Sequence, residues 1–556
     1  MLPAAAAGNG TNNFLVSVNS SGAQGNDYSF TSAISSDGHA VLFTSVATNL
    51  VPGDTNGRRD LFVRDRTAGT TTRATLTGSG GQIDNDVNDG AGDLSADGTR
   101  VVFSTPAKNV VPNDAEGDFD VFVRDLHSAT RTLMSVAPDG RPGATWHERS
   151  LTWRPADSDW PALSPDGRFV AFLSDASNLL SSDPAHQLFA GDQIYVRDLA
   201  TGKNSLASVG GSGQPARCVT CILVQGAPSV SAGGRFVVFQ SDAENLVPGD
   251  TNGGTDYFLR DLVAGTTERV NVTSSETQSA GEGIQARPAI SPNGRYVVFS
   301  STASDLVQGD TNEMMDIFLR DRVAGTTERV SLSNRGRESK KQKQGGNGSF
   351  SPAVSADGRF VSFVSLSNDL VDNDTGFAED VFVRDRTRGT TERITIPTGG
   401  GTPVRGYGTA GQRALSADGC FVALTSDRIG PGDATNEIKD AYLHDRAIAA
   451  RPTPVKTVAG VTLSILKQGR RLVSKGGIYA VCCGVHVAGK VAIRLFVYRP
   501  GARKFVPVER RTVPLDDEMR YATSFKRAKA RRCRATARFL GNDFYGWSLA
   551  VKKFRC

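Results

Sequence analysis

Short runs of alternating apolar and polar residues fill the first 450 positions of this chain and recur in one fixed order. Each copy contains a Ser-x-Asp-Gly turn, an apolar strand, a loop such as residues 49–56, a strand ending in Arg-Asp, and a Gly-Thr-Thr segment before a further strand. Alternation with a period of two is typical of β-strands that pack between neighbouring layers. The turns contain Asp37, Asp97, Asp166, Gly233, Asn293, Asp357 and Asp418.

Seven turns spaced 60 to 69 residues apart predict a seven-bladed β-propeller with long loops. In the fifth copy we expect an innermost strand at 288–291, a tight turn at 292–294 and further strands at 295–301 and 316–321. An outer strand around Val330 and Leu332 completes this blade. The repeat therefore predicts an all-β domain of equivalent blades.

The seventh copy has no outer strand of its own. Its last residues, 447–454, include Pro452 and Pro454, which lack the backbone donor that a strand needs. Residues 16–22 instead match the outer strand and exit loop of the fifth copy at 330–336. We expect this N-terminal strand to pair into blade seven and close the ring, because closure leaves only short, protected sheet edges.

The copies resemble the TolB-type propeller repeat, in which Ser-x-Asp-Gly-Arg, an aromatic-rich strand and Asp-Ile-Phe-Val-x-Asp recur, over about residues 12–450. The resemblance implies a propeller that acts as an interaction platform in the cell envelope. Because one fold hosts many activities, it does not identify a ligand. We expect residues 1–11 to be disordered or the remnant of a signal peptide, 12–451 to form the propeller, and 452–556 to form a second domain.

Charge separates the second domain from the propeller. Residues 452–556 hold 23 Lys and Arg against 5 Asp and Glu, which leaves 40 against 53 in the residues before them. Short apolar runs between Gly, Pro and charged turns predict a small β-sandwich here. Its last segment, from Cys533 through Cys556, resembles the terminal strands of bacterial immunoglobulin-like domains.

The cysteines indicate an oxidising compartment, and we expect an extracellular or cell-envelope location. A zinc site at Cys218 and Cys221 is disfavoured because no second ligand pair follows, so a local disulfide or two free thiols is the favoured interpretation. No run of about 18 apolar residues is present, so we expect no transmembrane span, and we expect a monomer. Two disulfides could form among Cys482, Cys483, Cys533 and Cys556, which leaves Cys420 over.

An oxygen-rich motif recurs in the loops between the second and third strands. Asp and Asn side chains alternate with residues that include glycine, which suits a hard cation such as calcium. The motif lacks the Glu that completes an EF-hand loop and decays in copies two, six and seven, so turn-forming hydrogen bonds are favoured over calcium. No other cofactor is expected. The candidate calcium ligands are Asp54, Asn56, Asp60, Asp250, Asn252, Asp256, Asp310, Asn312 and Asp316.

The Arg-Asp pair recurs in six copies, which indicates scaffold rather than catalysis, because an enzyme site is one constellation and not a feature of every blade. We expect Asp65 to cap its hairpin and Arg64 to pair with an acid across a blade interface.

The largest departure from the repeat lies between copies two and three, where three of the four tryptophans gather. Tryptophan beside Arg and Glu suits stacking on a sugar ring or anchoring a protein partner. The alternative is that these rings pack together as a local cluster. The candidate binding residues are Trp146, His147, Glu148, Trp153 and Trp160.

The leading hypothesis is a non-catalytic binding propeller that recognises a protein or glycan through the face that carries the long loops. The alternative is a propeller enzyme, a glycan hydrolase or lyase, with its site near the Trp146 to Trp160 insertion. It is disfavoured because His39 and His444 occupy repeat positions held elsewhere by Arg, and no Gly-x-Ser-x-Gly elbow is present.

A basic run in the second domain could anchor the protein to anionic cell-wall polymer by salt-sensitive attraction. A solvated basic strand face is the alternative. Nucleic acid is not an expected partner, because few aromatic residues interleave these charges. The candidate anchor residues are Lys526, Arg527, Lys529, Arg531 and Arg532.

Overall fold

The structure, a computed structural model, divides the chain into two compact units, residues 1–445 (unit 1) and 446–556 (unit 2). Beyond residue 446 it describes the strands alone. In the described part of the chain no helix is long and apolar enough to cross a lipid bilayer. Up to residue 446 it describes 13–446 apart from 89–91, 113–116, 148–151, 182–190, 218–226, 281–286, 341–347, 373, 375–378, 397–405, 408–412, 427–428 and 430–437.

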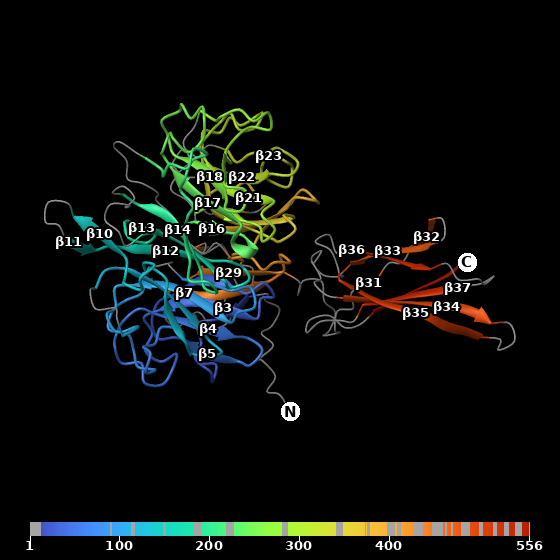
Figure 1. The fold of residues 1–556 in the computed structure, drawn as a ribbon, viewed down its shortest axis with the longest axis horizontal. Helices are drawn as coiled ribbons and strands as arrows, with labels where there is room; N and C mark the ends of the chain where they lie inside the picture. Colours follow the sequence, from blue (N-terminus) through green and yellow to red (C-terminus); the bar gives the residue numbers. More distant parts are fainter. Residues whose placement is uncertain are drawn as a thin grey trace. The chain divides into compact units, whose positions relative to one another are not determined.

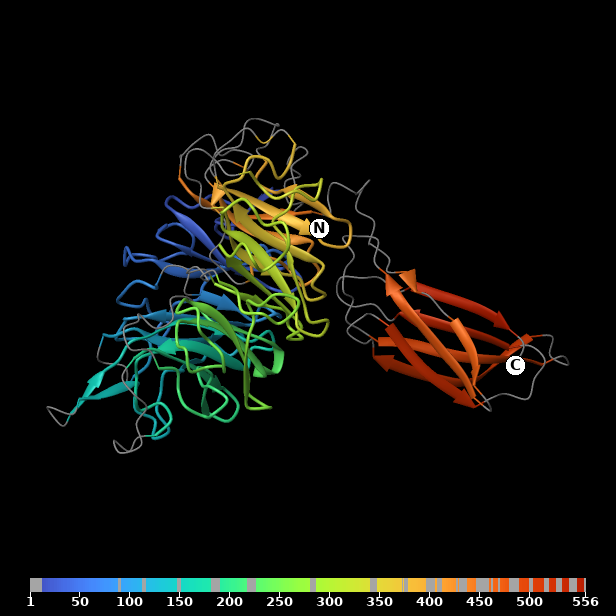
Figure 2. The same cartoon turned by 90° about the horizontal axis from the view of Figure 1, so that it is seen from above.

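The described residues of unit 1 form seven four-stranded antiparallel sheets, one for each sequence repeat. Figures 1 and 2 show the sheets following one another in chain order around a common centre, so the predicted seven-bladed propeller is confirmed.

We number the blades in chain order and give each from its innermost strand outward. Blades 1 to 3 are β2 (Ser29–Ile34), β3 (Ala40–Ser45), β4 (Asp60–Asp65) and β5 (Thr70–Arg73); β6 (Gly92–Leu94), β7 (Arg100–Thr105), β8 (Asp120–Asp125) and β9 (Arg131–Leu133); and β12 (Ser158–Leu163), β13 (Phe169–Ser174), β14 (Gln193–Asp198) and β15 (Asn204–Leu206). A two-stranded hairpin, β10 (Ala144–His147) and β11 (Thr152–Pro155), precedes blade 3.

The remaining blades repeat this order, with one short 3-10 helix, η2 (Ala232–Gly234), at the inner turn of blade 4. Blades 4 to 7 are β16 (Ser229–Val230), β17 (Phe236–Ser241), β18 (Asp256–Asp261) and β19 (Thr266–Arg269); β20 (Ala289–Ile290), β21 (Tyr296–Ser301), β22 (Asp316–Asp321) and β23 (Thr326–Arg329); β24 (Ser349–Val354), β25 (Phe360–Ser365), β26 (Asp380–Asp385) and β27 (Thr390–Arg393); and β28 (Gly406–Tyr407), β29 (Phe421–Ser426), β30 (Asp440–Asp445) and β1 (Asn13–Leu15).

The outer strand of blade 7 is the N-terminal strand, as predicted. β1 pairs antiparallel with β30, and the amide of Val16 continues the pairing by donating to the carbonyl of Ala441 at 2.8 Å. In blade 5 the amide of Val330 donates in the same way to Ile317 at 2.7 Å. The first and last parts of unit 1 therefore share one sheet, and the ring is closed.

The inner turns are linked by backbone hydrogen bonds that run around the centre. In each turn, the residue that follows the Ser donates its backbone N–H to the carbonyl of the equivalent residue in the next blade. Two of these hydrogen bonds are missing, because Pro165 and Pro292 occupy this position and have no N–H. The five bonds join Ser36 to Ala96, Ala96 to Pro165, Ala232 to Pro292, Ala356 to Ala417, and Ala417 to Ser36. The last of these couples blade 7 to blade 1.

The repeated motifs build turns and hairpins. The Ser35 hydroxyl donates to Asp37 at 2.6 Å, and Gly38 follows with φ +74°, where a Cβ would lie 2.3 Å from the ring of Phe421 in blade 7. Only glycine satisfies both that conformation and that close approach between blades.

The Arg-Asp pairs have the scaffold role that we expected, with one correction. Asp65 caps its hairpin, because its carboxylate accepts the backbone amides of Thr67 and Ala68, both at 2.8 Å. Arg64 was expected to pair with an acid, but its guanidinium donates to the carbonyl of Asn19 and the hydroxyl of Thr71, both at 3.1 Å. A carbonyl suffices because the exit loop of the preceding blade turns its backbone toward this guanidinium.

The core lies between neighbouring sheets and is rich in aromatic rings. Phe43 and Phe62 are fully buried and stack with their ring centroids 5.6 Å apart. Equivalent ring pairs join the second and third strands of further blades, and such pairs add about 0.5–1.5 kcal/mol each beyond area burial. They are Phe103–Phe122, Phe172–Tyr195, Phe239–Phe258, Phe299–Phe318 and Phe363–Phe382.

Unit 2 is also all-β. Its described strands form two antiparallel sheets: β31 (Gly460–Val461), β33 (Arg471–Tyr479), β32 (Ser464–Gln468) and β36 (Arg520–Lys526) in one, and β35 (Lys504–Pro514), β34 (Lys490–Arg499), β37 (Cys533–Phe539) and β38 (Ser548–Phe554) in the other. The immunoglobulin-like likeness of this unit stays a prediction. So do the disulfides, because Cys218, Cys221, Cys482, Cys483 and Cys556 lie outside the described residues.

Candidate functional site

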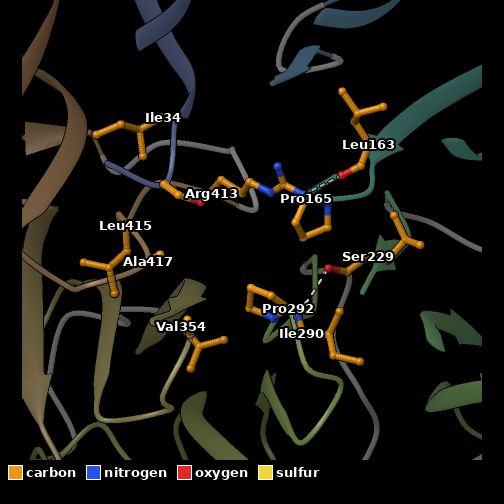
Figure 3. Close-up of a pocket in the computed structure, with 13 residues that line it drawn as sticks. Ile34, Leu163, Pro165, Ser229, Ile290, Pro292, Val354, Arg413, Leu415 and Ala417 are labelled. Atoms are coloured by element: carbon orange, nitrogen blue, oxygen red, sulfur yellow. Dashed lines mark hydrogen bonds between the residues drawn. The ribbon is translucent and has the colours of Figure 1, made fainter. Parts of the chain in front are cut away.

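The centre of the propeller is a narrow channel lined by the innermost strands. Apolar side chains from the blades face it, including Ile34, Leu163, Val230 and Leu415 (Figure 3). The cavity at this level has a volume of about 40 Å³, which is room for a few water molecules but not for a ligand of ordinary size. The inner part of the channel is therefore packing rather than a binding site.

One cation crosses this channel. Arg413 of blade 7 lies beside β2, since its carbonyl accepts the amide of Ile34 at 2.9 Å. Its guanidinium reaches across to donate to the carbonyls of Leu94 at 2.5 Å and Leu163 at 2.6 Å, the second of which is drawn in Figure 3. One side chain of blade 7 is therefore joined to blades 2 and 3, past blade 1.

The opposite end of the channel lies on the face that carries the long loops, the long-loop face, where each innermost strand begins. Trp160 lies here in β12, at a bulge where the register with β13 shifts. Its φ of +52° is in the left-handed region that bulky residues avoid, at a cost of about 1–2 kcal/mol. Backbone strain of this kind is common at ligand-binding positions, and here it sets the direction of a half-buried indole.

Arg287, which precedes blade 5, stacks on this indole. The carbon at the centre of its guanidinium lies 4.4 Å from the centroid of the Trp160 ring, within the range of a cation–π interaction. Burial lowers the pKa of Arg287 to about 10, against the opposing charges of Asp159 and Asp93. The side chain spans from blade 5 to blade 3 past blade 4, so this contact belongs to the channel mouth and not to one blade interface.

Asp159 supplies the negative charge at the mouth. Its carboxylate accepts hydrogen bonds from the Ser104 hydroxyl, the Asn88 amide group and, at 2.6 Å, the backbone amide of Trp160. Burial raises its pKa, while these hydrogen bonds and Arg287 act in the opposite direction. We call Asp93, Asp159, Trp160 and Arg287 the channel-mouth cluster.

Asp93 ties the cluster to the scaffold. Its carboxylate accepts the backbone amide of Leu94 at 2.7 Å and that of Leu163 at 2.8 Å. The carbonyls of the same two residues accept hydrogen bonds from the Arg413 guanidinium. The equivalent contact between blades 4 and 5 is made by the hydroxyl of Ser229. A carboxylate in place of a hydroxyl adds charge at the mouth without changing the backbone arrangement.

The channel-mouth cluster has the chemistry of a recognition site. It presents an aromatic face, a guanidinium and a carboxylate that is already held by three donors, so none of these groups is poised as a nucleophile or a general base. The three histidines whose side chains are described lie elsewhere: His39 contacts Thr67, Nδ1 of His444 lies 2.7 Å from Asn13, and His127 is exposed in the turn that follows β8.

The structure separates the predicted tryptophan cluster into two places. Trp146 and Trp153 are cross-strand partners in the β10–β11 hairpin, which forms a sheet of its own and lies at the edge of unit 1 in Figure 1. Trp160 is at the channel mouth. His147 is the last residue of β10, and Glu148 lies outside the described residues.

The basic anchor candidates belong to unit 2. Lys526 is the last residue of β36, which pairs with β33. Arg527, Lys529, Arg531 and Arg532 lie outside the described residues, between β36 and β37.

The candidate calcium ligands do come together, but around arginine. In blade 1 the Arg73 guanidinium lies 3.0 Å from Asp54 and 3.5 Å from Asp60, and the amide group of Asn56 donates to Asp60 at 3.3 Å. The same set forms around Arg269 with Asp250, Asn252 and Asp256, around Arg329 with Asp310, Asn312 and Asp316, and around Arg393 with Asp374 and Asp380.

This arrangement does not fit a calcium ion. A guanidinium occupies the space between the carboxylates, and the Asn amide group points a donor, not an oxygen, at the second Asp. Among the described residues no three acidic, His or Cys side chains are grouped as metal ligands are. In this structure the motif forms the turn and an ion pair, and the choice of turn chemistry over calcium stays a prediction.

Four residues of this region were not predicted from the sequence: Arg287, Asp159, Asp93 and Arg413. One signal for Arg287 exists: four of the seven repeats, those of blades 3 to 6, have an X-Pro step at the start of the innermost strand, where Trp160 and Arg287 occupy position X. Ala227 and Ser351 stand there in blades 4 and 6, so two large side chains replace small ones. Nothing local in the sequence indicates that the two meet.

Comparison with known proteins adds the fold. No family model and no curated protein matches the chain. Among solved structures it is similar to a putative TolB from Agrobacterium tumefaciens (18% identity, 55% of this chain and 80% of that one, TM-score 0.31). It is also similar to a puromycin-hydrolyzing peptidase from Mycobacterium tuberculosis (13%, 81% and 58%, 0.39) and to a GH74 enzyme from Niastella koreensis (12%, 93% and 77%, 0.27). These similar structures include a TolB and two enzymes.

Proposed function

We propose that this chain is a non-catalytic binding propeller of the cell envelope, and that it recognises a protein or glycan on its long-loop face at the mouth of the central channel. The observation that carries the proposal is the cation–π stack of Arg287 on Trp160, 4.4 Å from ring centroid to guanidinium carbon, above the carboxylate of Asp159. Aromatic and arginine side chains dominate the energy of recognition surfaces.

The position of the stack supports binding over packing. Other blades place alanine or serine where Trp160 and Arg287 stand, so the scaffold does not need these side chains. The positive φ of Trp160 recurs at Ser351 in blade 6, so the bulge belongs to the scaffold, and the indole placed on it distinguishes blade 3.

A matched pair of variants tests the proposal. Trp160→Asn removes the indole but keeps a residue that tolerates positive φ, and Ser351→Asn makes the same change at the equivalent bulge of blade 6, where φ is also +52°. The full chain and both variants are assayed against peptidoglycan fragments, neutral and acidic polysaccharides, and extracted envelope proteins.

We expect at least one class to bind, with binding weakened about tenfold or more by Trp160→Asn and by Arg287→Gln, as hot-spot residues require, and unchanged by Ser351→Asn. Equal binding by all variants would remove the channel mouth from the proposal. Chemical turnover of a bound glycan would replace the proposal with the enzyme alternative.

The basic second unit supports an anchoring role within the same proposal. Its 25 Lys and Arg against 5 Asp and Glu attract anionic polymer nonspecifically. Retention of the full chain on anionic cell wall should fall steeply with added salt, whereas recognition at the channel mouth should not. Retention that is insensitive to salt would count against the anchor.

A further inference from the structure

A second hollow lies on the long-loop face, at the seam between blades 7 and 1. It has a volume of about 280 Å³ and is lined by Tyr28, Phe30, Ser45, Val46, Arg59 and Lys439. A cavity of about 150 Å³ is enough for benzene, so this seam pocket has room for one six-membered ring with its substituents. Its walls are aromatic, and its charged side chains are both cations.

The aromatic wall is built by β2. Tyr28 directly precedes this strand and Phe30 is its second residue, and both line the pocket. Tyr28 is 47% exposed, which is unusual for a large ring in this protein. The Lys439 ammonium lies 5.6 Å from the centroid of the Phe30 ring, and the amide of Ser29 donates to the carbonyl of Lys439 at 2.9 Å, which holds the two elements together.

The cations are a departure from the repeat. Each blade has an equivalent residue directly before its third strand, and only two of the seven are positively charged. In blade order they are Arg59, Phe119, Asp192, Thr255, Met315, Glu379 and Lys439. The two cations come from the adjacent blades 1 and 7, and both line the seam pocket. In a propeller with more acidic than basic residues, that placement favours a negatively charged ligand.

The aromatic pair is also specific to this seam. Phe350 in blade 6 is equivalent to Phe30 in blade 1, and in both strands a bulge follows the phenylalanine. At the place of Tyr28, blade 6 has Gly348, and the facing residue is Met315 instead of Lys439. Blade 6 therefore keeps the scaffold of the pocket without its ring pair and its charge, and provides a matched control.

The acidic residues beside the pocket have other roles. The Asp27 carboxylate accepts the backbone amide of Tyr28 at 2.8 Å. The Asp86 carboxylate accepts the backbone amide of Arg59 at 2.7 Å and pairs with the side chain of Arg58 at 3.6 Å. Both carboxylates stabilise the backbone that forms the pocket, and neither is among the residues that line it.

We propose that the seam pocket binds a six-membered ring that carries a carboxylate. The ring packs on Tyr28 and Phe30, and the carboxylate lies toward Lys439 and Arg59, which form charge-assisted contacts with it. A uronic acid unit of an acidic polysaccharide and an aromatic carboxylate both have this chemistry. The inference rests on the pocket alone and does not depend on the partner proposed for the channel mouth.

The test titrates the full chain with four probes and follows binding by saturation-transfer NMR and calorimetry. Glucuronate and benzoate represent the two sources of the ligand, and glucose and benzyl alcohol are their uncharged counterparts. The variants are Lys439→Gln and Phe30→Leu, with Phe350→Leu as the control in blade 6 and Trp160→Asn as the control for the channel mouth.

We expect glucuronate, benzoate or both to bind the parent chain. Their uncharged counterparts should bind about tenfold more weakly or not at all. Lys439→Gln should weaken binding of the carboxylates by about the same factor, which is the loss expected for one charge-assisted contact. Phe30→Leu should also weaken binding, while both controls should match the parent chain. Failure of both carboxylates to bind at about 10 mM, equal binding of the uncharged probes, or insensitivity to both pocket variants would each overturn the proposal. Loss of probe binding in Trp160→Asn would move the site to the channel mouth.

Discussion

The Arg73 guanidinium lies between two carboxylates of one loop, 3.0 Å from Asp54 and 3.5 Å from Asp60, and all three side chains are buried. The arginine supplies the positive charge that a calcium ion would otherwise bring. We therefore predict that millimolar calcium and a chelator both leave the melting temperature of the full chain unchanged, because a ligand specific to the native state has to raise it. Thermal unfolding followed by circular dichroism checks this, and a rise with calcium would restore the metal interpretation.

The same ion pair predicts a large loss on removal of the arginine. Arg73→Leu leaves the carboxylates of Asp54 and Asp60 buried without their partner, which should cost about 3–5 kcal/mol of unfolding free energy. Arg58→Leu is the control, because Arg58 is half-exposed and pairs with Asp86 at 3.6 Å, and it should cost less than about 1 kcal/mol. Urea denaturation of both variants gives the comparison. Similar losses of unfolding free energy in the two variants would show that the buried ion pair contributes no more to stability than the exposed one.

These carboxylates also predict how stability depends on pH. Burial raises the pKa of Asp60, Asp310 and Asp380 to about 6 in the folded protein, from an ordinary value near 3.8. The folded state then binds more protons than the unfolded state between about pH 4 and pH 6, so the unfolding free energy falls as pH rises through that window. Above pH 6 these groups add no further change. Urea denaturation at half-unit pH steps measures the slope.

Two variants isolate this contribution. Asp380→Asn removes one such group, so the fall in unfolding free energy between pH 4 and pH 6 should be smaller than in the parent chain. Asp261→Asn should change the slope in this window only slightly, because the Arg235 guanidinium lowers the pKa of Asp261 to about 2 in the folded protein and most of the difference from its ordinary value near 3.8 is expressed below the window. A slope that is the same in Asp380→Asn and in the parent chain would contradict the assignment.

The sequence predicts the structural features that recur in every blade. It predicts few of the side-chain contacts between blades that are distant in the chain. The blade number, the cap formed by Asp65 and the N-terminal strand in blade 7 follow from aligning copies, since each is a local pattern or a match between copies. The stack of Arg287 on Trp160 joins positions 127 residues apart across the ring, and the arginine carries no signal except its place before a proline. The guanidinium of Arg73 was missed in the same way, because it enters the loop from a strand that the motif does not include.

Arg413 gives a prediction about the central channel. Its guanidinium donates to the carbonyls of Leu94 and Leu163 across the centre of the ring. Arg413→Met keeps most of the apolar bulk and leaves both carbonyls without this donor, so we expect a loss of about 2–4 kcal/mol of unfolding free energy, about 1–2 for each carbonyl. Urea denaturation measures it. Replacement at no cost would mean that water serves these carbonyls equally well.

Closure of the ring by the N-terminal strand can be tested one hydrogen bond at a time. The hydroxyl of Ser17 donates to the buried carboxylate of Asp440 at 2.7 Å, a bond between residues 423 positions apart. The hydroxyl of Ser331 makes the equivalent bond to Asp316 within blade 5, where the strands are consecutive in the chain. If the N-terminal strand is bound to blade 7 as stably as the outer strands are bound in other blades, Ser17→Ala and Ser331→Ala should each lower the free energy of unfolding by about 1–2 kcal/mol. Urea denaturation measures both losses. A loss for Ser331→Ala alone would mean that the ring opens at this seam before the blades unfold.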